Sequence, residues 1–147
     1  MYPEADIPCV QLSLVNNLSA DTHLAIGRAL KSLERENLLV IGSGFSFHNM
    51  REFFSPITQD SQAKNKAFED WLVTTCSSQD IDEAERSRQL ANWDKAPYAR
   101  FCHPREEHLL PLHVCYGLAG RPSDEQLSAT ILNKASGMFY WSRKSAK

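Results

Sequence analysis

The pattern of apolar and polar positions divides the first third of the chain into three segments. Residues 9–14 (Cys-Val-Gln-Leu-Ser-Leu) alternate apolar and polar side chains, which is the period of a half-buried strand. Residues 20–36 carry apolar side chains at helical spacing, and Ser19 before them is a suitable N-cap. Residues 38–41 (Leu-Leu-Val-Ile) form an uninterrupted apolar run, which predicts a strand covered on both faces.

The same pattern continues through the middle and the end of the chain. Residues 66–75 have an apolar stripe typical of an amphipathic helix. Asp80 with Glu83 predicts a capping box for a short charged helix that ends near residue 90. Residues 128–132 and 138–141 are predicted as two strands flanking a serine–glycine pair. These elements together indicate an α/β protein.

A further helix is predicted over residues 104–116. Pro104 suits its first turn, because the missing N–H would have no partner there. The two glutamates that follow, including Glu107, would meet the positive end of the helix dipole. Pro111 should kink this helix, and Gly120 should end it.

Composition narrows the classes of protein that fit. The 147 residues, 42% hydrophobic and 23% charged, indicate one globular domain. A net charge of −2 gives no electrostatic footprint for nucleic acid or an anionic membrane, and no apolar run approaches the roughly 18 residues of a membrane helix. The four cysteines form no C-x-x-C pair, which argues against a zinc ribbon and favours reduced thiols in the cytoplasm.

The five histidines raise the question of a metal site. His103, His108 and His113 are evenly spaced by five residues, and five residues turn a helix about 140° beyond one full circle, so the three cannot share a face. Neither H-E-x-x-H nor a C₂H₂ spacing is present. A metal site would need His48, in the glycine-bearing loop after residues 38–41, together with His108. The carboxylates next to His108 either orient an imidazole or cap the helix.

Four segments match the motifs of one known family. They are residues 1–14 (Met-Tyr-Pro-x-Ala-Asp-Ile-Pro-x-Val-Gln-Leu-Ser-Leu), residues 23–30 (His-Leu-Ala-Ile-Gly-Arg-Ala-Leu), residues 41–51 (Ile-Gly-Ser-Gly, ending in His-Asn-Met-Arg) and residues 104–112 (Pro-x-x-Glu-His-x-x-Pro-Leu). In combination they resemble the class III extradiol ring-cleavage dioxygenases, and most of all the branch that contains the 4,5-DOPA enzymes.

The resemblance implies a fold, a reaction and roles for four residues. It implies a mixed central sheet between helices, a non-haem Fe(II) often recovered as Zn(II), and insertion of O₂ into a catechol such as DOPA. His108 matches a metal ligand of the family, and His48 matches the histidine that acts as acid and base beside the metal. Glu107 and Asn49 are candidates for supporting these two imidazoles. We therefore expect His48 and His108 to lie close together, and His103 to be exposed or structural.

The family has two further motifs, Gly-His-Gly-Ser-Pro and Ser-x-His-Trp, that precede the point corresponding to Met1. Neither occurs in this chain. Residues 1–147 are therefore expected to form the C-terminal portion of a single catalytic domain, with an incomplete set of metal ligands and an incomplete sheet. An unpaired sheet edge at residues 38–41 would favour self-association. The alternative hypothesis is a non-catalytic remnant or interaction module that keeps the fold.

Overall fold

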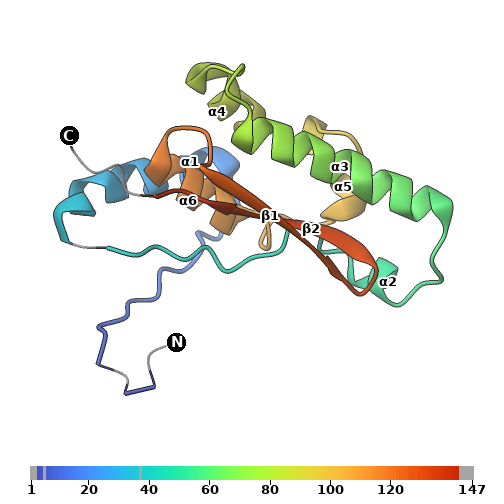
Figure 1. Cartoon of the computed structure of the whole chain (residues 1–147), viewed down its shortest axis with the longest axis horizontal. Coiled ribbons are helices and arrows are strands. Elements are labelled where there is room, and N and C mark those ends of the chain that lie inside the picture. Colours follow the sequence, from blue (N-terminus) through green and yellow to red (C-terminus); the bar gives the residue numbers. More distant parts are fainter. Residues whose placement is uncertain (1–2, 5, 37, 143–147) are drawn as a thin grey trace.

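The structure, a computed structural model, describes residues 3–4, 6–36 and 38–142. This part of the chain consists of helices and one antiparallel hairpin, which confirms the α/β class. Figure 1 shows the hairpin lying across the helices, with the longest helix on one side of it. The elements are α1 (Ala20–Leu30), η1 (Lys31–Glu36), α2 (Met50–Phe53), α3 (Gln59–Ser77), α4 (Glu83–Ala91), η2 (Trp93–Lys95), α5 (Ala99–Cys102), α6 (Leu110–Ala119), β1 (Glu125–Ile131) and β2 (Lys134–Tyr140).

Helix α1 begins where the sequence predicts and packs closely against α6. The hydroxyl of Ser19 accepts the backbone N–H of Thr22, so the expected N-cap is confirmed. After Leu30 the helix tightens into the 3₁₀ turn η1. Glycines form the contact with α6, because a Cβ at Gly27 would meet a carbonyl oxygen of α6 and a Cβ at Gly117 would meet the carbonyl oxygen of Leu24. The two helix backbones can approach only because both side chains are absent.

Helices α3 and α4 differ from the prediction at their starts. Helix α3 begins at Gln59 rather than residue 66, because Thr58 and Ser61 form a reciprocal capping box that admits a polar first turn. Helix α4 is capped by Asp82, whose carboxylate accepts the N–H of Glu85 at 2.8 Å, and the predicted cap at Asp80 is wrong.

A buried arginine joins α4 to the end of α3. The Arg86 guanidinium is fully buried and donates to the carbonyl oxygens of Thr75, Ser78 and Ile81. Its Nε also donates to the Glu83 carboxylate at 2.9 Å. A buried cation is stable here because its donors are paired, and two of its acceptors are at the last turn of α3, where carbonyls have no helical partner.

The predicted helix over residues 104–116 is wrong in its first half. Residues 104–109 form bends and turns, and α6 begins only at Leu110. Pro111 therefore stands in the first turn of α6 and does not kink it, since its missing N–H leaves no hydrogen bond unmade there. Gly120 closes the helix as expected, with a left-handed φ of 58° and its N–H on the carbonyl oxygen of Tyr116 at 2.7 Å.

Strands β1 and β2 form a hairpin that is longer than the sequence predicts. Their register runs from Glu125 opposite Tyr140 to Ile131 opposite Lys134. The two turn residues, 132 and 133, have φ of 48° and 62°, which suits the right-handed twist of the strands. The serine–glycine pair expected between two strands lies inside β2. Asn65 of α3 fixes the hairpin by bonding both the N–H and the carbonyl oxygen of Ala135.

The two strands predicted near the N-terminus are not formed. Residues 9–14 and 38–41 run as extended chain in Figure 1, and no backbone–backbone hydrogen bond joins them to another described residue. Val10, Leu39 and Ile41 are 96%, 65% and 63% exposed. An apolar pattern shows only that the side chains are suited to burial. A strand also needs an adjacent strand to bond its backbone N–H and C=O groups. The expected central mixed sheet is thus limited, in the described residues, to the two strands of the hairpin.

The core lies where α1, α3, α4 and α6 meet. Its fully buried side chains include Leu24, Phe68, Leu72, Leu90 and Leu110. None of the helices in the described ranges is long and apolar enough to cross a membrane.

We predict that Gly117→Ala destabilises the fold by about 1–3 kcal/mol, as overpacked cores do. The added methyl group must push α6 away from the backbone of α1 at Leu24, and the gain in helix propensity from losing a glycine is only about 1 kcal/mol. Chemical denaturation followed by circular dichroism measures the change. Ala25→Ser, on the exposed side of α1, is the control and should change the free energy of unfolding by less than about 0.5 kcal/mol. An unchanged midpoint in Gly117→Ala would contradict the close helix contact.

Candidate functional site

The structure brings the imidazoles of His48 and His108 together. Their ring centroids are 3.3 Å apart and the rings are stacked, with an angle of 18° between their planes. His48 lies in the loop just before α2, and His108 lies in the turn two residues before α6. Both side chains are half-buried. The expected proximity of these two histidines, which are separated by 59 intervening residues, is confirmed.

Backbone contacts place the His48 loop against the turn that carries His108. The N–H of Phe45 donates to the carbonyl oxygen of His108, and the N–H of His48 donates to that of Cys102, both at 2.9 Å. Gly44 allows this approach, because a Cβ at that position would collide with the His108 carbonyl oxygen. Both imidazoles are thus positioned by main-chain hydrogen bonds. The only residue type that these contacts require is the glycine at position 44.

Asn49 holds the same loop from its other end. Its side-chain oxygen accepts the N–H of Glu52 at 3.3 Å and so caps α2, while its side-chain nitrogen donates to the carbonyl oxygen of Phe101 at 2.7 Å. Among the described residues, the Asn49 side chain makes no hydrogen bond to either imidazole. Its contribution to the site is therefore to fix the backbone next to His48.

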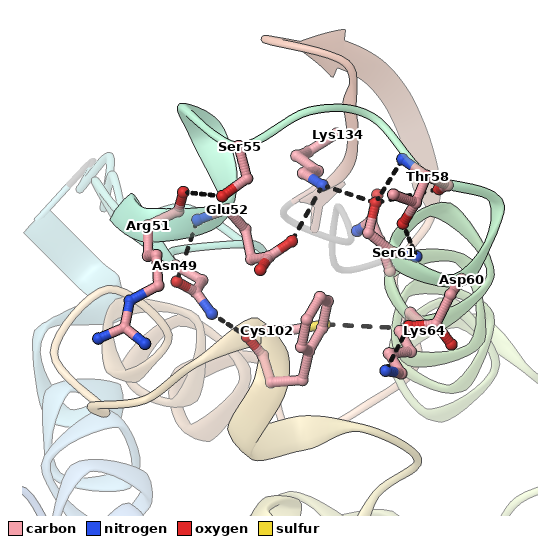
Figure 2. A network of polar contacts seen from close by, with 12 residues as sticks. Asn49, Arg51, Glu52, Ser55, Thr58, Asp60, Ser61, Lys64, Cys102 and Lys134 are labelled. Carbon is pink, nitrogen blue, oxygen red and sulfur yellow. Dashed lines mark hydrogen bonds and ion pairs between the residues drawn. The ribbon is translucent and has the colours of Figure 1, made fainter.

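A buried lysine extends this network to the hairpin (Figure 2). Lys134, at the start of β2, is 2% exposed, and its Nζ lies 3.4 Å from the Ser61 hydroxyl and 3.9 Å from the Glu52 carboxylate. The same ammonium group lies over the ring of Phe47, 5.3 Å from its centroid. Helix α2, the start of α3 and the hairpin are thereby joined around one cation.

The carboxylates next to His108 do not cap α6, which begins without a side-chain cap. Glu106 pairs with Arg100 at 2.6 Å. Glu107 lies 3.3 Å from the Nε of Arg105, but this contact is poorly aligned, and its buried Oε2 accepts no hydrogen bond from a described residue. Burial lowers the pKa of His48, the neighbouring His108 lowers it further, and the Glu107 carboxylate opposes both effects.

The other histidines in the described ranges are buried and bonded to the main chain. The ring of His103 lies between Phe68 and Trp93, and its Nε2 donates to the carbonyl oxygen of Ser46 at 2.7 Å. Burial lowers the pKa of His103 to about 4. His113 contacts the Leu90 carbonyl oxygen at 2.9 Å. Of the two expectations for His103, the structural role is correct and exposure is not.

A carboxyl group that the sequence did not single out lies behind the His48 loop. Glu69 of α3 is 6% exposed, and its Oε1 has no hydrogen-bond partner in the described residues. Burial raises its pKa to about 7, against hydrogen bonding from Ser46 and the backbone of Gly137. Residue 69 lies inside the helix predicted over residues 66–75, but its burial could not be read from the sequence because it depends on where the hairpin packs against α3.

The described residues do not complete a metal site. They contain no group of three or more histidine, cysteine, aspartate or glutamate side chains placed to hold one ion. The lone pairs of an imidazole lie in the ring plane, and two nearly parallel planes 3.3 Å apart have no common position near the rings toward which both can point. His48 and His108 are therefore not co-ligands in this arrangement, while a protein metal site needs about three ligands.

A cleft of about 870 Å³ opens beside His108. Residues 38–42 and 44–46 form one wall, residues 137–142 of β2 and the chain after it form the other, and α6 contributes Leu112, Cys115, Leu118 and Ala119. The lining is mostly aliphatic and aromatic. Its arginine, Arg121, is paired with Asp124 at 2.7 Å.

Comparison of the sequence with known families gives a match over nearly the whole chain. The family described as "Catalytic LigB subunit of aromatic ring-opening dioxygenase" matches residues 1–142. The chain belongs to this family, as the motifs around His48 and His108 indicated.

Individual relatives agree with the family. A 4,5-DOPA dioxygenase extradiol of Beta vulgaris is 38% identical over 128 residues, which are 86% of this chain and 45% of that protein. A protein of the same name from Portulaca grandiflora is 39% identical over 130 residues, with the same coverage. Dioxygenase tasH of Hapsidospora irregularis is 33% identical over 95% of this chain. The chain spans about 45% of the length of each of these relatives.

We predict that Asn49→Ala lowers the free energy of unfolding by about 1–2 kcal/mol, through loss of the cap and of the bond to Phe101. Asn49→Asp keeps the cap acceptor and loses only the donor, so it should lie between Ala and wild type. Chemical denaturation gives the free energy of unfolding of each protein. The NMR chemical shifts of the His48 ring protons show whether the conformation of the loop has changed. Equal stability of all three proteins would contradict the role assigned to Asn49.

A second prediction concerns Glu69→Gln and pH. The folded state binds the Glu69 proton more tightly than the unfolded state does, so its stabilising contribution is complete below about pH 4.5 and is lost as the pH rises through about 7. Relative to wild type, the glutamine variant should gain about 1–3 kcal/mol between pH 4.5 and 8 and then remain level. The difference isolates Glu69, because His103 acts equally in both proteins. A pH-independent difference in unfolding free energy would contradict burial of the carboxyl group.

Proposed function

We propose that this chain is the C-terminal portion of the catalytic domain of an extradiol dioxygenase, which opens a catechol ring such as that of DOPA with O₂. The observation that carries the proposal is the pairing of His48 and His108 beside a cleft. These residues belong to separate motifs of the LigB family, and a shared substrate is a reason for them to meet. The names of the relatives support the same reaction class.

The proposed role of His48 is that of acid and base toward the catechol. Its lowered pKa keeps the imidazole neutral at physiological pH, and a neutral imidazole can accept a proton from a catechol hydroxyl and return it later. Glu107 is placed to modulate this proton affinity, since it is the charged group that raises the His48 pKa. Asn49 supports the reaction through the loop backbone.

The proposed role of His108 is that of one ligand to a non-haem Fe(II) or Zn(II). Its ring makes no hydrogen bond to a described residue, so its nitrogens are available. The remaining ligands are proposed to belong to the part of the relatives' length that this chain does not match. The described residues alone do not complete the coordination of such a metal.

A non-catalytic role remains the second candidate. The incomplete ligand set and the exposed apolar side chains of residues 38–41 favour an interaction module that keeps part of the fold. For either role we propose a cytoplasmic location, because all four cysteines are free thiols.

Catechol-dependent O₂ uptake with added Fe(II) tests the enzyme proposal. The chain alone should show no uptake above buffer. A chain extended at its N-terminus by the unmatched part of the Beta vulgaris relative should turn over DOPA. The substitution His108→Ala in that extended protein should abolish turnover and should also prevent the binding of one equivalent of iron. Gln62→Ala, an exposed position on α3, is the control and should retain full activity. Robust turnover by the chain alone, or full activity of His108→Ala, would refute the ligand assignment.

The role of His48 is tested in the same extended protein. His48→Gln should lower kcat by about 10²–10⁴-fold, the range of acid–base catalysis, and should leave the bound iron unchanged. Loss of iron together with activity would instead identify His48 as a ligand. Unchanged kcat would remove the acid–base role.

A further inference from the structure

A short segment at the end of α5, residues 101–103, forms three hydrogen bonds with the loop at residues 46–49. Two of them run from the loop to the carbonyl oxygens of residues 101 and 102. The third runs in the opposite direction, because the Nε2–H of His103 donates to the carbonyl oxygen of Ser46 at 2.7 Å. This third bond is the one made by a side chain of the segment, and it holds the loop two residues before His48.

The imidazole of His103 carries a polar atom that packing alone does not need. The ring is fully buried between Phe68 and Trp93, whose ring centroids are 5.5 and 5.8 Å from its own. Burial lowers the pKa of His103 to about 4 and so keeps the ring neutral. Because Nε2 carries the donated hydrogen, Nδ1 is an acceptor, and it has no hydrogen-bond partner among the described residues. An unpaired buried acceptor is unfavourable, and a hydrocarbon ring would fill this space without one. What the imidazole provides in return is the Nε2–H donor.

We propose that His103 is a positioning residue of the candidate site: its Nε2–H fixes the Ser46 peptide group and thereby keeps the His48 ring stacked on that of His108. The inference rests on the proposed function, because this position of His48 matters for catalysis only if His48 transfers a proton to a bound substrate.

Ser46 can transmit the position of His103 to His48 because it is buried and held on two sides. It is 6% exposed, and its hydroxyl oxygen accepts the N–H of Gly137 at 2.9 Å. Without the His103 donor, its carbonyl oxygen would be an unpaired buried group, so the peptide would turn toward another partner. His48 follows two residues later, and its ring centroid lies 3.3 Å from that of His108. A displacement of about 1 Å can lower the rate of a reaction between positioned groups by about 10²-fold.

Two substitutions separate positioning from packing. His103→Phe keeps an aromatic ring between the same neighbours and loses the donor, whereas His103→Gln loses the ring and keeps an N–H donor near the end of the side chain. If His103 served packing alone, phenylalanine would be the better replacement in every measurement. The proposal predicts the opposite order at the candidate site. Thr75→Val is the control, because it removes a buried hydrogen bond to Gln89 in another part of the core.

NMR of the 147-residue chain without metal measures the ring contact directly. We expect nuclear Overhauser effects between the ring protons of His48 and His108 in wild type, Thr75→Val and His103→Gln, and their loss in His103→Phe. The His48 amide should exchange with solvent at least about tenfold faster in His103→Phe than in wild type, because its bond to Cys102 opens more often. His103→Leu also lacks a donor, and it replaces His103→Phe if that variant loses its helical circular dichroism.

Three NMR results would overturn the proposal. They are a retained ring contact and a protected His48 amide in the folded variant without a donor, loss of the ring contact in folded His103→Gln, and an equal loss in Thr75→Val.

Kinetics of the N-terminally extended protein give a second readout. His103→Phe should lower kcat for DOPA by about 10²-fold, with KM changed less than about threefold and the bound iron unchanged. His103→Gln should retain a kcat within about tenfold of wild type, and Thr75→Val should match wild type. Equal kcat values in His103→Phe and His103→Gln would overturn the proposal. Because the NMR measurements need neither metal nor catechol, the expected NMR order together with an extended protein that does not open the ring would contradict only the proposed function.

Discussion

The candidate site depends on the contact between the loop at residues 44–49 and the turns that follow α5 and precede α6. Two backbone hydrogen bonds, from Phe45 to His108 and from His48 to Cys102, hold the loop in place, and Gly44 permits the approach. Without this contact nothing would hold the segment that contains His48 next to the segment that contains His108. Asn49 reinforces the same contact from α2.

Elements with local signals were predictable from the sequence. The cap at Ser19, the end of α6 at Gly120 and the meeting of His48 with His108 were all anticipated, the last because both residues belong to motifs of one family. The errors have equally local causes. Helix α3 begins earlier than predicted because a serine served as the second half of its capping box, and Pro111 starts α6 because residues 104–109 are already folded into turns.

Features that depend on distant partners could not be read from the sequence. The apolar runs at residues 9–14 and 38–41 predicted strands, but a strand forms only beside another strand, and none lies next to them in the described part of the chain. The buried positions of Glu69 and Lys134 depend likewise on where the hairpin packs. The described residues likewise bring no group of three or more potential metal-binding side chains together around His108.

We propose that His108 binds the metal and that His48 lies beside it without binding. Pulsed electron paramagnetic resonance of the nitrosyl complex of Fe(II), in the N-terminally extended protein with ¹⁵N-labelled histidine, measures coordinated imidazoles directly. The account predicts one fewer coordinated imidazole in His108→Ala than in the unsubstituted protein, and no change in His48→Ala. An unchanged signal in His108→Ala, or the loss of an imidazole in His48→Ala, would contradict it.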